Sequence, residues 1–132
     1  MPDYFSLLDG HQYMSLKTFR KSGAAVPTPV WFAADGDRLV VVTQADSGKA
    51  KRIRNNGAVE VAPCDRAGGL LGVDYVAAQA KPLADGPASE QADRLLNRKY
   101  GWQKKLFEIT WKVRRTSHVY LEITPPPATG NP

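Results

Sequence analysis

The sequence contains a single cysteine, Cys64, and no apolar run that approaches the roughly eighteen residues of a membrane-spanning helix. One cysteine excludes an internal disulfide and argues against a cysteine-based metal site. The lack of disulfides is in keeping with a reducing compartment. We expect Cys64 to be a small core residue at the end of a strand. The first residues, MPDYFSLLDG, carry acids where a signal peptide would carry basic residues, so we expect a cytoplasmic protein without membrane insertion.

Histidines and recognisable catalytic motifs are also scarce. The only histidines are His11 and His118, and the sequence lacks the G-x-S-x-G, H-E-x-x-H, P-loop and G-x-G-x-x-G patterns. Asp35, Asp37 and Asp46 lie in turn-like contexts, where carboxylates usually cap backbone donors. We therefore predict no catalytic side chain and no metal site. If the protein is an enzyme, its chemistry must come from a bound cofactor.

What the sequence does contain is the composition of one globular domain with surplus positive charge. Its 132 residues, 42% of them hydrophobic, are enough to bury a core. Lysine and arginine number 18 against 13 acids, and the net charge of +5 favours anionic partners such as phosphorylated cofactors, nucleic acid or acidic lipids. We expect a single domain over residues 1–124 and a flexible proline-rich tail over 125–132.

Short runs rich in β-branched and aromatic residues predict a mainly β fold. They cover residues 14–21, 26–34, 38–43, 58–64 and 73–83. Turn sequences at 22–25 (SGAA) and 35–37 (DGD) should make the first three strands sequential neighbours. The last run, SHVYLEIT, places Val119, Leu121 and Ile123 on one face and should return to close an antiparallel barrel. Pro27 and Pro29 must lie where no ladder hydrogen bond is needed.

Three segments have helical patterns. Ser47 is a good N-cap for a short helix over 48–55, with Ala50 and Ile53 facing inward and the basic residues outward. A second helix over 88–100 ends before Gly101, and a third run follows it. The expected inward residues of these two are Ala88, Ala92, Leu95 and Leu96, and then Trp102, Leu106, Ile109 and Val113.

The stretch SGKAKRIRNN, residues 47–56, combines a helix start with four basic residues. Ser47 and Gly48 would offer free backbone N–H groups, and Lys49 adds a full charge in the same turn. Cations are disfavoured at a helix start by about 0.5 kcal/mol or more, so we infer that these basic residues are present because they bind an anionic ligand. A solvated basic face is the ordinary alternative. Nucleic acid fits less well because no aromatic residues alternate with the basic ones, whereas a phosphorylated small molecule could lie against Trp31.

Four segments together carry a family resemblance. They are TPVWF at 28–32, Thr43, SGKAKRIRNN at 47–56 and APCDRAG at 62–68. Over residues 13–122 the chain resembles the split β-barrel superfamily of pyridoxamine 5'-phosphate oxidase, and within it the deazaflavin (coenzyme F420)-dependent oxidoreductases. The resemblance implies an FMN-binding type of split β-barrel and a homodimer with its sites between subunits. It also implies hydride transfer from reduced coenzyme F420 to an electron-poor small-molecule acceptor.

The resemblance further implies which residues bind the coenzyme. In relatives, the positions that match Ser47 and Lys49 hold the phosphate, and the threonine that matches Thr43 lies beside it. These residues and Gly48 between them are here called the phosphate set. A second group lines the tricyclic ring, and this ring set is Thr28, Pro29, Val30 and Trp31. A third group could meet the acidic oligoglutamate tail of the coenzyme, and this tail set is Lys51, Arg52 and Arg54.

One departure from the family pattern bears on which cofactor is bound, coenzyme F420 or FMN. Oxidases of the superfamily carry an arginine at the position of Gly48, and glycine cannot supply that second phosphate contact. An FMN-dependent oxidase or reductase on the same fold is therefore the alternative. A non-catalytic flavin- or haem-binding protein and a basic nucleic-acid-binding barrel are the further alternatives, and none of them changes the predicted fold.

Overall fold

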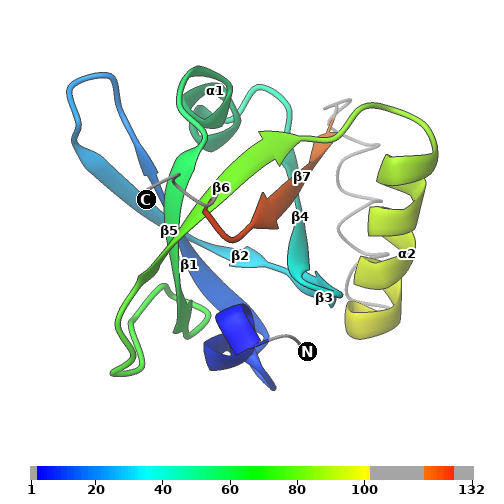
Figure 1. The fold of residues 1–132 in the computed structure, drawn as a ribbon, viewed down its shortest axis with the longest axis horizontal. Helices are drawn as coiled ribbons and strands as arrows, with labels where there is room; N and C mark the ends of the chain where they lie inside the picture. The colour runs from blue at the N-terminus through cyan, green and yellow to red at the C-terminus, as the bar shows by residue number, and fades with distance from the viewer. Residues whose placement is uncertain (1–2, 102–117, 127–132) are drawn as a thin grey trace, which may run out of the picture.

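The computed structural model describes residues 3–101 and 118–126 and has the mainly β fold that the sequence predicts. Two helices, a 3-10 helix (η1) and seven strands follow one another along these residues (Figure 1). In chain order they are η1 (Asp3–Leu8), β1 (Tyr13–Phe19), β2 (Ala25–Trp31), β3 (Ala33–Asp35), β4 (Arg38–Gln44), α1 (Gly48–Asn55), β5 (Ala58–Cys64), β6 (Val76–Pro82), α2 (Pro87–Tyr100) and β7 (His118–Thr124).

The described strands form one antiparallel sheet in the order β2-β1-β5-β6-β7-β4-β3. β2 and β3 lie at opposite ends of this order, yet only Phe32 separates them in the chain. The sheet must therefore curl until its two ends meet, which makes it a split barrel (Figure 1). β7 pairs with both β6 and β4, so the last strand closes the barrel as predicted.

The second predicted strand, 26–34, was wrong as a continuous element. It breaks at Phe32, so that β2 pairs with β1 while β3 pairs with β4. Both predicted hairpins are present, but each uses a different half of this segment. β2 is an edge strand, which explains how Pro27 and Pro29 fit into it without costing a ladder hydrogen bond.

The barrel interior holds the main hydrophobic core. β7 contributes Leu121 and Ile123, both fully buried, with Val119 partly buried beside them, as the alternating pattern predicts. Cys64 is buried at the end of β5, also as predicted. The other interior residues are mostly aliphatic and include Met14, Leu16, Val30, Leu39, Val41, Ile53, Val59 and Val61.

A second, smaller core lies outside the barrel, where α2 packs against β3, β4 and β7 (Figure 1). Ala92 and Leu96 are buried there as predicted, but Ala88 is exposed and Ser89 is buried instead. Ser89 is held inward because its hydroxyl donates to the carbonyl of Ala84 (2.7 Å). The predicted third helical run and most of the predicted tail lie outside the described residues.

No helix in the described part of the chain is long and apolar enough to cross a membrane.

Candidate functional site

The start of α1 has the geometry of an anion site. Ser47 is the N-cap, and its Oγ accepts a hydrogen bond from the Ala50 N–H (3.2 Å) and lies 3.3 Å from Thr43 Oγ1. Thr43 is buried at the end of β4, so the sheet fixes the position of the cap. The N–H groups of Gly48 and Lys49 precede the first intrahelical donor and have no acceptor among the described residues. The phosphate set is thus brought together around two free donors.

Lys49 adds a cation to this helix start, and no described residue forms an ion pair with it. Its side chain is partly buried and forms no hydrogen bond or ion pair with the described residues. Burial, and secondarily the nearby Arg52 guanidinium, lowers the pKa of Lys49. The first turn of α1 contains no acid. A partly buried ammonium group in this position is stabilised only when an anion joins it.

Arg52 does not point outward, contrary to the prediction for the basic residues of this helix. Its Nε donates to the hydroxyl of Thr18 (2.6 Å), a fully buried residue of β1. Gly48 makes room for this conformation, because a Cβ at residue 48 would lie 2.7 Å from Arg52 Nη1. The glycine that removes a possible phosphate contact therefore allows Arg52 to fold back over the helix start.

Arg52 also lines a groove between α1 and the β1–β2 hairpin. The groove has a volume of about 550 Å³ and is lined by Phe19, Arg20, Lys21, Gly23, Arg52, Asn55 and Asn56. None of its lining residues is acidic, and the side chains of Arg20 and Lys21 have no partner among the described residues. Burial, followed by the charge of Arg20, lowers the pKa of Arg52. We refer to this feature as the cationic groove.

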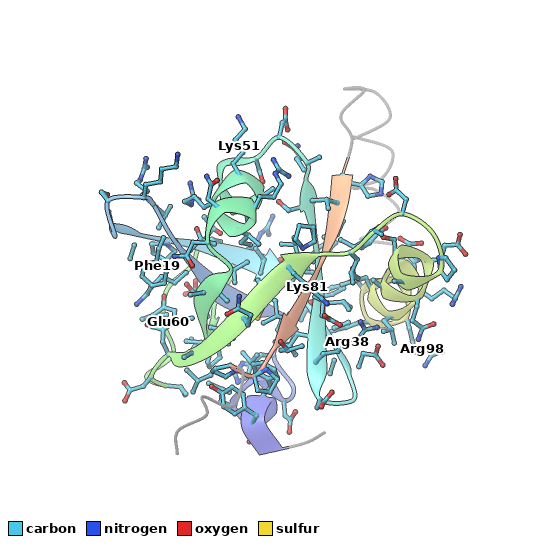
Figure 2. The ribbon with its side chains drawn as sticks, turned by 45° about the horizontal axis from the view of Figure 1, so that its top comes forward. Phe19, Arg38, Lys51, Glu60, Lys81 and Arg98 are labelled. Carbon is cyan, nitrogen blue, oxygen red and sulfur yellow. The ribbon has the colours of Figure 1, made fainter. Side chains whose placement is uncertain are left out.

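Arg20 and Lys21 were not predicted as site residues, although they form a basic pair beside the SGAA turn in the sequence. The rest of the tail set lies outside the cationic groove. Lys51 is exposed on the side of α1 that faces away from the barrel. Phe19, which lines the groove, lies on β1 instead (Figure 2). Arg54 is exposed and donates to the carbonyl of Ala45 (3.2 Å).

The ring set occupies β2 but divides between the two faces of that strand. Val30 points into the core, and the Thr28 Oγ1, on the same face, is buried without a hydrogen-bond partner in the described structure. Pro29 is exposed, and the Trp31 side chain lies on the outer side, where its ring stacks on Tyr100 (centroids 4.4 Å apart, planes at 10°). Only Pro29 and Trp31 can therefore offer side-chain surface to one flat ligand.

A family model described as pyridoxamine 5'-phosphate oxidase matches residues 2–125. The chain belongs to this family. The match covers the whole barrel and both parts of the candidate site, namely the helix start and β2. No curated protein matches the sequence.

Several solved structures share the fold of this family member. The heme storage protein HutZ from Vibrio cholerae superposes with a TM-score of 0.68 at 12% identity, over 90% of this chain and 84% of HutZ. An F420 reductase gives a TM-score of 0.58 at 22% identity, over 96% of this chain and 95% of its own. General stress protein 26 from Bacillus anthracis gives 0.60 at 21% identity, over 90% and 83% of the two chains. At these identities the likeness is one of fold.

The two parts of the candidate site are linked through β1. Arg52 reaches Thr18, whose hydroxyl in turn lies 3.4 Å from the carbonyl of Val26, at the start of β2. The helix start, the cationic groove and β2 thus belong to one continuous region of the molecule. No cluster of potential metal ligands occurs within the described ranges.

Proposed function

We propose that this protein is an oxidoreductase dependent on the deazaflavin coenzyme F420, which reduces an electron-poor organic acceptor. Three features support the proposal: membership of the pyridoxamine 5'-phosphate oxidase family, the uncompensated cation at the start of α1, and the cationic groove beside it. An F420 reductase with the same fold adds to this support.

The main support for the proposal is the Lys49 ammonium group beside the free N–H groups at the start of α1. A phosphate group there would accept hydrogen bonds from the free N–H groups of Gly48 and Lys49 and neutralise the Lys49 ammonium. The Ser47 hydroxyl already caps the helix, so its part is to hold the N–H groups in position, with Thr43 behind it. We assign the phosphate of the coenzyme to this position.

The cationic groove favours the deazaflavin over FMN. Arg52 lies one helical turn beyond Lys49, so the groove begins next to the proposed phosphate position. Coenzyme F420 carries a chain of carboxylates beyond its phosphate, whereas FMN ends at the phosphate. We propose that Arg52 binds these carboxylates together with Arg20 and Lys21. Lys51 and Arg54, exposed beside the groove, would contribute only through weaker, salt-screened attraction.

When bound, the reduced deazaflavin supplies the hydride. The protein's contribution is to orient and to exclude water. Pro29 and Trp31 offer a flat apolar surface on the outer side of β2, and the β2 edge offers backbone carbonyl groups where prolines remove the donors. Thr28 and Val30 support this strand from inside the barrel. From the family resemblance we further propose a homodimer whose partner subunit completes the site.

Fluorescence titration of the purified protein with coenzyme F420 and, separately, with FMN at two salt concentrations tests this function. Micromolar or tighter binding of the deazaflavin, with weaker FMN binding, is expected. Preference for FMN would overturn the cofactor assignment. Oxidation of reduced coenzyme F420 is then followed with a panel of conjugated ketones, quinones and tetrapyrroles; binding without turnover on any of them would favour a carrier. Sedimentation velocity measures the proposed dimer.

A further inference from the structure

At Phe32, between β2 and β3, the chain passes from one end of the strand order to the other, and we refer to this strand break as the junction. The last paired residues of β1 and β2 are Tyr13 and Trp31. Gln12 and Phe32 would form the next pair if the ladder continued. Instead, the hydroxyl of Tyr100, at the end of α2, lies between them, 2.7 Å from the Gln12 carbonyl and 2.9 Å from the Phe32 nitrogen.

The hydrogen bonds at this junction can be assigned from the number of available protons. The Phe32 carbonyl lies 2.8 Å from Lys99 Nζ and 2.9 Å from the Tyr100 hydroxyl. A phenol has one proton, and Lys99 already satisfies the Phe32 carbonyl. Tyr100 therefore donates to Gln12 and accepts from the Phe32 N–H. Burial raises the pKa of Tyr100 well above its usual range, so the hydroxyl keeps this proton.

The same two residues also hold the aromatic rings at the junction. The Tyr100 ring stacks on Trp31 with their planes at 10°, and Lys99 Nζ lies 3.5 Å from the centroid of the Phe32 ring. Tyr100 is 4% exposed, so its ring cannot move without disturbing the smaller core. The end of α2 thus fixes both the backbone and the side chains where β2 ends.

We propose that Tyr100 is a positioning residue for the ring platform of Pro29 and Trp31: its hydroxyl replaces the missing ladder pair at the strand break, and its ring sets the plane of the Trp31 indole. This inference rests on the proposed function for its effect on the coenzyme. β2 is the terminal strand of the sheet order, and without the bridging hydroxyl the Phe32 N–H would have no acceptor in the described structure.

Tyr100→Phe keeps the stacked ring and removes only the hydroxyl. The matched control is Tyr120→Phe, because Tyr120 is also buried in the smaller core, but its hydroxyl bonds Asp93 Oδ1 on α2 (2.5 Å) instead of the backbone at Phe32. We expect Tyr100→Phe to weaken coenzyme F420 binding about tenfold and to accelerate exchange of the Phe32 amide about tenfold or more. Tyr120→Phe should leave both quantities within about twofold of the wild type.

Amide exchange separates this inference from the proposed function. If the wild type binds coenzyme F420, unchanged affinity in Tyr100→Phe overturns the positioning role. If the wild type binds neither coenzyme F420 nor FMN, the proposed function fails, and Phe32 exchange decides alone: faster exchange in Tyr100→Phe supports the bridging hydroxyl, and unchanged exchange overturns it. Should the variant not fold, an unprotected Phe32 amide in the wild type overturns the inference, and a protected one supports it.

Discussion

Replacing Lys49 with methionine should separate ligand binding from folding. The ammonium group is partly buried, unpaired in the described structure and close to Arg52, so it contributes little to the folded state. Methionine keeps the apolar part of the side chain. We expect the free energy of unfolding to change by no more than about 0.5 kcal/mol, and to rise if it changes.

The effect of Lys49→Met on the anion should be much larger. A hydrogen bond to a charged group contributes about 1.5–3 kcal/mol, which corresponds to a Kd about 10- to 150-fold higher. Fluorescence titration with coenzyme F420 measures this change, and urea unfolding measures stability. The control is Lys51→Met, because Lys51 lies on the same helix but is exposed and points away from the barrel (Figure 2).

The salt dependence of binding gives an independent check. Loss of one phosphate contact should reduce the dependence of the Kd on ionic strength in Lys49→Met. Coenzyme binding by Lys49→Met within about twofold of the wild type would rule out a phosphate contact at Lys49. A loss of about 2 kcal/mol or more in the free energy of unfolding would show instead that Lys49 is a packing residue.

Three further predictions concern the groove, the junction and the helix. Arg20→Gln with Lys21→Gln should weaken binding of coenzyme F420 about tenfold but leave FMN binding unchanged, as titration would show; equal losses would contradict a groove for the carboxylates. Burial lowers the pKa of Lys99 from 10.5 to about 8, so the unfolded chain binds more protons between these values and stability should rise with pH there. In Lys99→Met, urea unfolding at pH 8 and 10 should show a smaller rise in the free energy of unfolding than in the wild type. A rise as large as that of the wild type would exclude Lys99 as its cause. Ile53→Ala, which empties a fully buried position, should cost about 2–4 kcal/mol in the same assay, and a cost below about 1 kcal/mol would mean that α1 is not anchored by its inner face.

Local patterns predicted most of the fold. The N-cap at Ser47 and the inner face of α1, Ala50 and Ile53, could be found because capping and helical spacing depend on neighbours in the chain. The alternation in β7 likewise predicted which of its residues enter the core. The phosphate set lies together because it spans only seven consecutive residues, from 43 to 49, at the end of a strand and the start of a helix.

Long-range contacts decided what the sequence could not show. Arg52 looked like any other basic residue of α1, but it reaches Thr18, which is 34 positions away. The ring set looked like one surface, but the pleat of β2 sends Thr28 and Val30 inward and leaves Pro29 and Trp31 outside. The Arg52 contact depends on which strand lies beside α1. Alternation along β2 is local, but which of its two faces is buried depends on how the barrel closes.

The sequence alone was thus enough to predict α1 with its N-cap, α2 and both hairpins, because each of these depends on residues a few positions apart; it did not predict η1. The tertiary structure alone decided the strand break at Phe32. A continuous apolar run favours one long strand, and the run is interrupted only because the barrel has to close and because Tyr100, 68 residues later, satisfies the backbone where the ladder ends. The groove has the same origin, since it exists only where the β1–β2 hairpin and α1 come together.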